Sequence, residues 1–238
     1  MIPESIPFSR ADISPLVYLG EAWTRVKDRY WLFFGITAVG MLLGSAAPLG
    51  VLLGPMMCGI FLCYRRQTQG LPITFDMLFK GFDHFTESFI ASLLMLAASL
   101  VLILPMIVMM FVAMFMGVLG GIAGHGAERG AAFLGCFLFA ATFLFVLLGS
   151  ALIGIFFTFT YPLVMDRGLP GLEAVKLSFR AARANFGGLL LLALVNALLT
   201  FAGLLCCYVG ALFVLPLTLG THWICYERVF GIKQADEA

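Results

Sequence analysis

The sequence predicts an all-α integral membrane protein with six transmembrane helices, arranged as three hairpins that each follow an amphipathic interfacial helix. Its composition is 62 % hydrophobic and 11 % charged, whereas soluble domains carry about 25 % charged residues. Its mean hydropathy is +1.04. The charges are also confined, because no Asp, Glu, Lys or Arg occurs in 31–64, 88–124, 131–165 or 184–226. Since one membrane crossing needs roughly 20 apolar residues, these stretches predict several spans.

The first and the last of these stretches each divide into a helical pair. The expected turns are the sequences GSAAPLG and LLCCYVG, at 44–50 and 204–210. The two middle helices are longer than a bilayer requires, and Pro105 and Pro162 are positions where a helix can kink or end. The six expected spans are 31–48, 49–65, 88–118, 131–165, 187–206 and 208–227.

The basic residues predict the orientation, because cytoplasmic loops are enriched in Lys and Arg. With both termini on one side of the membrane, that side holds thirteen of the 14 basic residues, and the other holds only Arg129, in the sequence GHGAERG. We therefore expect a multi-pass protein of the cell's inner (cytoplasmic) membrane with both termini facing the cytoplasm.

A segment with a helical apolar stripe precedes each expected hairpin, at about 15–30, 74–88 and 171–185. Apolar residues at alternating steps of three and four place one stripe on each helix, and such helices beside a span lie at the headgroup level. The stripes are Leu16, Leu19, Trp23, Val26 and Tyr30; Phe75, Leu78, Phe82, Phe85 and Phe89; and Leu172, Val175, Phe179, Ala182 and Phe186.

The unit of one interfacial helix and one hairpin is therefore expected three times, at about 14–66, 72–165 and 170–230 of a single membrane domain. The pattern Cys-Tyr-x-Arg occurs at 63–66 and at 225–228, and Gly-Leu-Pro occurs at 70–72 and at 168–170. A four-residue echo alone is weak, because many multi-pass proteins end cytoplasmic spans in Tyr and Arg. The three stripes in matching positions favour a true repeat.

Two regions resemble known membrane proteins. Residues 55–94, with the pattern F…LF-x-GF, resemble a group of uncharacterised bacterial multi-pass proteins. Residues 161–230 resemble the membrane domain attached to some glycerophosphoryl diester phosphodiesterases. The resemblance implies a helical membrane domain without the catalytic barrel of those enzymes, so no active-site residue is carried over.

Two sets of candidate site residues follow from these patterns. The basic residues of the interfacial helices and the hairpin ends are expected to bind lipid headgroups: Arg25, Lys27, Arg29, Arg65, Arg66, Lys176, Arg180 and Arg183. The polar residues Asn196, Thr200 and His222 lie within expected spans, where helix packing is the more common role. A substrate path, or a proton or ligand site at His222, is the alternative.

A metal site is the least favoured reading of the remaining polar residues. Asp83, His84 and Glu87 lie within one helical turn, but a metal needs three or four converging ligands, so a polar headgroup-level face is expected instead. The six cysteines lie in or beside apolar stretches without metal-ligand spacing, and are expected to fill apolar space. We expect no metal and no cofactor.

The expected function is that of a non-catalytic membrane scaffold or accessory protein. No nucleotide-binding loop, Ser-His-Asp arrangement or pair of buried carboxylates is recognisable, so an enzyme is not expected. The expected partners are anionic lipid and either further copies of the chain or another membrane protein, and not nucleic acid. The alternative is a passive channel or a transporter of lipids or small amphiphiles. An ion-driven carrier is disfavoured, because the spans lack the charges that usually mark such proteins.

Overall fold

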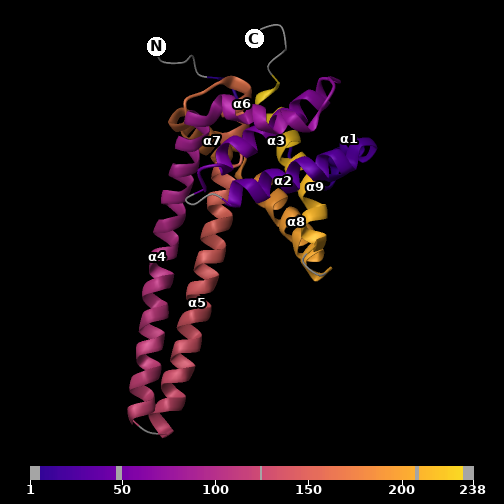
Figure 1. The fold of residues 1–238 in the computed structure, drawn as a ribbon. Helices are drawn as coiled ribbons and strands as arrows, with labels where there is room; N and C mark the ends of the chain where they lie inside the picture. Colours follow the sequence, from indigo (N-terminus) through magenta and orange to yellow (C-terminus); the bar gives the residue numbers. More distant parts are fainter. Residues whose placement is uncertain (1–5, 47–49, 124, 207–208, 233–238) are drawn as a thin grey trace. The chain divides into compact units, whose positions relative to one another are not determined.

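The computed structural model describes residues 6–46, 50–123, 125–206 and 209–232, and every regular element within these ranges is helical. The chain divides into two compact units. We call residues 1–94 with 155–238 the body, and residues 95–154 the long hairpin. The elements (Figure 1) are α1 Pro15–Val26, η1 Lys27–Arg29, α2 Tyr30–Ala46, α3 Leu53–Thr68, η3 Phe75–His84, α4 Phe85–Ala123, α5 His125–Phe157, α6 Thr160–Arg167, α7 Gly171–Ala184, α8 Phe186–Leu205 and α9 Val209–Phe230.

Five helical stretches of the described chain are long and apolar enough to cross a membrane, as expected of a multi-pass membrane protein. The sixth expected span, 49–65, corresponds to α3, which has only 16 residues and ends in Arg-Arg-Gln-Thr. At about 1.5 Å per residue, α3 rises about 24 Å, less than the roughly 30 Å of a hydrocarbon core. The five stretches are Pro15–Ala46, Phe75–Met116, Phe133–Arg167, Phe186–Leu205 and Val209–Phe230.

The two prolines of the middle pair have different effects. Pro105 lies inside α4 and does not end it, whereas the expected span 131–165 is divided into α5 and α6, with a turn at Thr158 and Phe159. Pro162 is the third residue of α6, where its missing N–H costs nothing because the first four N–H groups of a helix have no intrahelical partner. The expected turns at 44–50 and 204–210 include residues 47–49 and 207–208, which lie outside the described residues.

The three segments expected as interfacial helices are helical and contain α1, η3 and α7, although η3 is a 3-10 helix and not the expected α-helix. The apolar stripes are only partly exposed: Leu16 is 74 % exposed and Phe179 47 %, whereas Val26, Leu78 and Ala182 are fully buried. The stripes therefore point partly outward and partly into the body.

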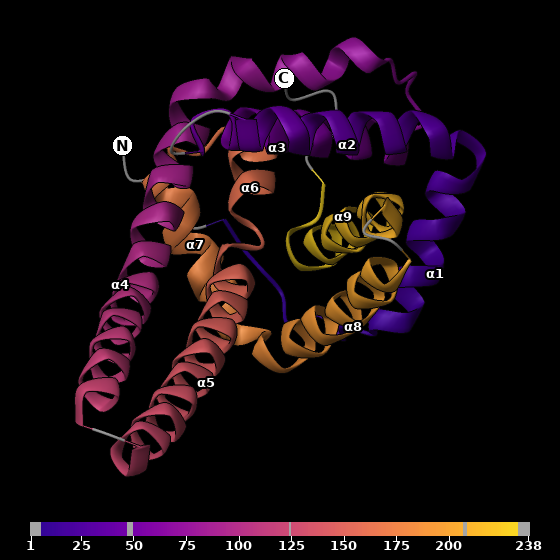
Figure 2. The same cartoon turned by 60° about the horizontal axis from the view of Figure 1, so that its bottom comes forward.

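Helix α9 is the centre of the body, where it contacts α1, α2, α3 and α8 (Figure 2). Its side chains Trp223 and Tyr226 are fully buried, together with Phe33 from α2, Phe61 from α3 and Phe159 before α6. The backbones of α3 and η3 approach closely at Gly59, because a Cβ there would overlap the carbonyl oxygen of Leu78.

Three helices of the body end at a glycine with positive φ. Gly70 follows α3 with φ of 69°, Gly168 caps α6 with φ of 63°, and Gly231 follows α9 with φ of 68°. Glycine is favoured there because other residues are strained in the left-handed region. The three expected repeats thus share a glycine conformation after their ends, whereas the Cys-Tyr-x-Arg pattern occurs only at the first and the third.

The long hairpin pairs the remaining parts of α4 and α5 (Figure 1). Gly135 faces Ala113 across the pair, and Gly149 faces Leu102. The half-buried residues recur at steps of three and four, as in an antiparallel coiled-coil seam, while most other side chains are exposed. The seam residues are Ser99, Leu102, Met106, Met109, Ala113 and Met116 of α4, and Gly135, Leu138, Thr142, Val146, Gly149 and Ile153 of α5.

Candidate functional site

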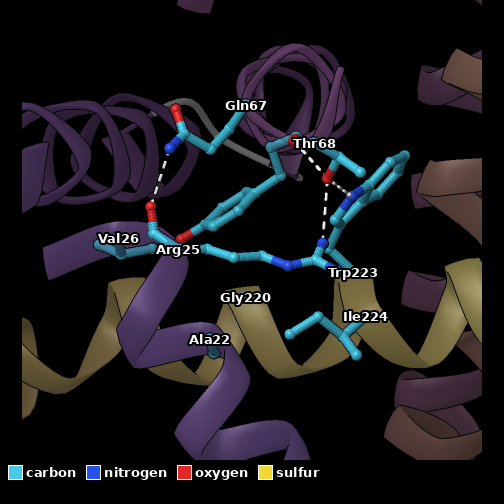
Figure 3. A pocket seen from close by; sticks show the side chains of 9 residues that line it. Ala22, Arg25, Val26, Gln67, Thr68, Gly220, Trp223 and Ile224 are labelled. Atoms are coloured by element: carbon cyan, nitrogen blue, oxygen red, sulfur yellow. Dashed lines mark hydrogen bonds between the residues drawn. The ribbon is translucent and has the colours of Figure 1, made fainter. Parts of the chain in front are cut away.

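A polar network joins α1, α3 and α9 inside the body (Figure 3). The guanidinium of Arg25 donates from Nη1 to Glu227 Oε2 at 2.8 Å and to Thr68 Oγ1 at 3.0 Å. Its Nη2 donates to Glu21 on the preceding turn of α1. The Arg25 charge is therefore neutralised by two carboxylates from different helices.

Thr68 is the hub of this network. Its hydroxyl donates to Glu227 Oε1 at 2.6 Å and accepts a hydrogen bond of 3.2 Å from Trp223 Nε1. Gln67 adds a bond of 2.9 Å from Nε2 to the carbonyl of Arg25. Every polar group named here has a partner, as a buried network requires.

The space around this network is filled by side chains and has no room for a water molecule. Gly220 of α9 lets α1 approach, since a Cβ at Gly220 would lie 3.1 Å from the Cβ of Ala22. Tyr64 closes the space from α3, and its hydroxyl donates to the carbonyl of Pro216 at 2.6 Å. This part of the body is a packed joint between three helices.

A second joint is built on Asp166, whose side chain is 0 % exposed. Its carboxylate lies 3.2 Å from Arg65 Nε and 3.3 Å from Arg167 Nε, and accepts a hydrogen bond of 2.8 Å from Tyr226 Oη. Arg167 also donates from Nη2 to the carbonyl of Phe230 at 2.9 Å. The Asp166 charge lies between two cations and the Tyr226 hydroxyl, and this cluster ties α3, α6 and α9 together.

The sequence reading missed Asp166. A signal was present, because Asp166 is the first charge after the long uncharged stretch 131–165 and precedes the Gly-Leu-Pro punctuation. Its partners Arg65 and Tyr226 belong to other stretches, so their proximity depends on the tertiary fold.

The eight expected headgroup cations fall into three groups. Arg25 and Arg65 belong to the two joints, and Arg66 donates from Nε to the carbonyl of Pro72 at 3.1 Å. Lys27 and Arg29 are exposed on η1. The third group lies exposed on α7 and consists of Lys176, Arg180 and Arg183.

The expected intramembrane polar residues are brought together in part. Asn196 of α8 donates from Nδ2 to Thr221 Oγ1 of α9 at 3.0 Å, and the same nitrogen lies 3.2 Å from His222 Nε2. Among the described residues, the hydroxyl of Thr200 donates a hydrogen bond to the carbonyl of Asn196, one turn earlier in the same helix. The structure thus adds Thr221, a fully buried residue, to an interhelical contact of the kind that holds spans together.

Compared with protein-family models, with curated proteins and with solved structures, the chain has no match. The proposed function therefore rests on the contacts between the residues described above.

In the part of the chain that the structure describes, no group of three or more His, Cys, Asp or Glu side chains lies close enough together to hold one metal ion. Glu87, one of the acidic residues beside His84, has a different contact: its Oε2 accepts a hydrogen bond of 2.7 Å from the backbone N–H of Gly171. Glu87 thus satisfies one of the N–H groups that the start of α7 leaves open.

Proposed function

We propose that the protein is a non-catalytic scaffold or accessory protein of the bacterial inner membrane, which binds anionic lipid and associates with further copies of itself or with a membrane partner. The observation that carries the proposal is the use of its inner charges. Arg25, Glu227 and Asp166 are each consumed in contacts between helices of the body, and the space around Arg25 is filled. Ion pairs of this kind stabilise the packing of the helices within the body. These three charged groups do not surround a cleft in which a substrate could react.

The proposed arrangement is six spans in three hairpins, related as repeats, with both termini in the cytoplasm. The exposed apolar residues in the stripes of α1, η3 and α7 support interfacial positions for these helices. The three glycines with positive φ support the repeat. The short helix α3 serves as the sixth span if Arg65 and Arg66 mark its cytoplasmic end, since a bilayer thins around an apolar segment shorter than its hydrocarbon core. The resemblance to membrane domains of phosphodiesterases without their catalytic part fits the same proposal.

A passive channel or a lipid or amphiphile transporter requires a continuous path through the body. The packed joint at Thr68 disfavours such a path between α1, α3 and α9. The interhelical bonds of Asn196 give that residue a packing role without any substrate.

The proposal is tested by two measurements on the full chain in lipid. Native mass spectrometry of protein released from nanodiscs of phosphatidylglycerol and phosphatidylcholine should show retained phosphatidylglycerol and a second copy or a co-purified membrane protein. Proteoliposomes should show no flux of small dyes and no exchange of labelled lipid above protein-free vesicles. Flux that rises with protein content and is altered by Asn196→Leu would support the transporter instead.

A further inference from the structure

The outer face of α7 is held in one rotation by contacts on its inner face. Ser178 Oγ donates to the carbonyl of Phe156 at 2.7 Å and accepts a bond of 3.2 Å from the N–H of Phe159. Ala174 and Ala181, one turn to either side, are fully buried. Lys176 and Arg180, on the opposite side of the helix, are therefore fixed outward.

These two cations line a surface hollow of about 590 Å³ together with Val175 and Phe179. The hollow is open on one side, so a lipid headgroup can lie against its lining without being enclosed. Phe179 is held as a wall of the hollow, because its ring stacks on Phe156 with centroids 4.3 Å apart. The lining is thus divided into a cationic pair and an apolar pair.

The cationic pair has the spacing to hold a phosphate. Residues four apart on a helix are neighbours on its surface, and Arg forms charge-assisted, often paired hydrogen bonds to phosphate oxygens. Lys176 is paired with Glu173 at 2.8 Å, in an ion pair that is exposed on both sides. Arg180 makes no ion pair or side-chain hydrogen bond with the residues that the structure describes, so its donors face the hollow unused.

The balance of charge selects the ligand. Glu173 offsets Lys176, while Arg180 and the nearby exposed Arg183 leave this face of α7 positive. A lipid with a net negative headgroup is favoured there, whereas a zwitterionic lipid brings a cation of its own. The apolar half of the lining suits an acyl chain and not a free phosphate ion.

We propose that the hollow on α7 is a binding site for an anionic phospholipid, with the phosphate between Lys176 and Arg180 and an acyl chain along Val175 and Phe179. The site rests on the lipid binding of the proposed function and gives it a location. It differs from a general attraction of the membrane surface for basic residues, because it requires these two cations in particular.

The experiment compares two double variants that each remove two exposed cations. Lys176→Gln with Arg180→Gln empties the cationic half of the hollow, and Lys27→Gln with Arg29→Gln is the matched control on η1. Each protein is purified from nanodiscs of equal phosphatidylglycerol and phosphatidylcholine, and retained lipid is counted by native mass spectrometry. Thermal unfolding of all three proteins verifies that exposed substitutions leave the fold intact.

The α7 variant should retain at least about fivefold less phosphatidylglycerol than the wild type, as expected for the loss of two cations at a lipid phosphate. The η1 variant, which keeps both cations of the hollow, should retain clearly more phosphatidylglycerol than the α7 variant, and millimolar inorganic phosphate should not displace the lipid. Equal retention by the α7 variant and the wild type, or equal losses in both variants, overturns the site but leaves general binding of anionic lipid intact. Displacement by inorganic phosphate overturns the acyl-chain half of the proposal. A wild-type protein that retains no phosphatidylglycerol contradicts the lipid binding of the proposed function itself.

Discussion

Tyr226 donates a hydrogen bond of 2.8 Å from its hydroxyl to Oδ2 of Asp166, and so joins α9 to α6 at a buried carboxylate. The phenol is the neutral member of a cluster whose other members are the guanidinium groups of Arg65 and Arg167. A neutral donor to a buried charge contributes without adding a charge that needs compensation.

Tyr226→Phe should therefore lower the free energy of unfolding by about 2 kcal/mol, because a charge-assisted bond to a buried group is lost. The measurement is equilibrium unfolding in mixed detergent micelles. Tyr64→Phe is the matched control, since its buried hydroxyl bonds only to the neutral carbonyl of Pro216, and it should cost about 1 kcal/mol. A Tyr226→Phe protein as stable as the wild type would show that the cluster does not depend on the phenol.

Gly59→Ala should disrupt the crossing of α3 and η3. The added Cβ overlaps the carbonyl oxygen of Leu78, and backbone cannot move aside as a side chain can. We expect a loss of about 3 kcal/mol, the upper end for overpacking, and faster maleimide labelling of the buried thiols of Cys58 and Cys63 on α3.

Gly20→Ala is the control for this substitution, because nothing lies within 4 Å of the added Cβ in α1. It should raise stability by about 0.5–1 kcal/mol through helix propensity. Unchanged thiol protection in Gly59→Ala would mean that η3 can move away from α3 at little cost.

Glu227→Ala should cost about 2 kcal/mol, because among the described residues it leaves the partly buried Arg25 with Glu21 as its one carboxylate partner. The Glu227 side chain is 9 % exposed. Glu173→Ala breaks the exposed pair with Lys176 and should change stability by less than about 1 kcal/mol. If the two losses are equal, the joint around Thr68 is not a stabilising network. The double variant of Arg25 and Glu227 should lose less than the sum of the two single variants.

The orientation prediction is tested by cysteine labelling in intact cells. In a background with Cys136, Cys206 and Cys207 replaced by Ser, one cysteine is introduced at Gly130 or at Gln69, while the buried Cys58, Cys63 and Cys225 stay in place. A membrane-impermeant maleimide should label Gly130→Cys from outside and reach Gln69→Cys only after the cells are opened, because the basic residues favour the cytoplasmic side. The reverse pattern would overturn the whole assignment of sides.

The lengths of the uncharged stretches were informative about the helices. The expected span 187–206 agrees with α8 Phe186–Leu205 to one residue at each end, and residues 209–227 of the expected span 208–227 lie in α9, since apolar length is read directly from the sequence. The 3-10 geometry of η3 was not readable, because it accompanies the close approach to Gly59 of a different helix. The side to which the stripes point was also open, since lipid and protein interior attract the same residues.

The candidate residues were predictable only singly. Asn196 stands out in an apolar span, but its partner Thr221 is one of several hydroxyl residues, and the sequence around Thr221 and His222 does not show that it meets Asn196. The roles of Arg25 and Arg65 as internal ion-pair partners depend on Glu227 and Asp166, which lie far away in the chain. Pairing of this kind follows from the tertiary arrangement of α1, α3, α6 and α9.

The seam of the long hairpin makes its length adjustable in fixed steps. Contacts between α4 and α5 recur about every seven residues. Removing seven residues from each helix at facing positions therefore brings the same seam residues back opposite one another. Each such step shortens the pair by about 10 Å. Removal of three or five residues from one helix would instead turn the small residues Gly135 and Gly149 away from Ala113 and Leu102. Hairpins of this construction can therefore match membranes of different thickness by gaining or losing whole heptads, while the body stays unchanged.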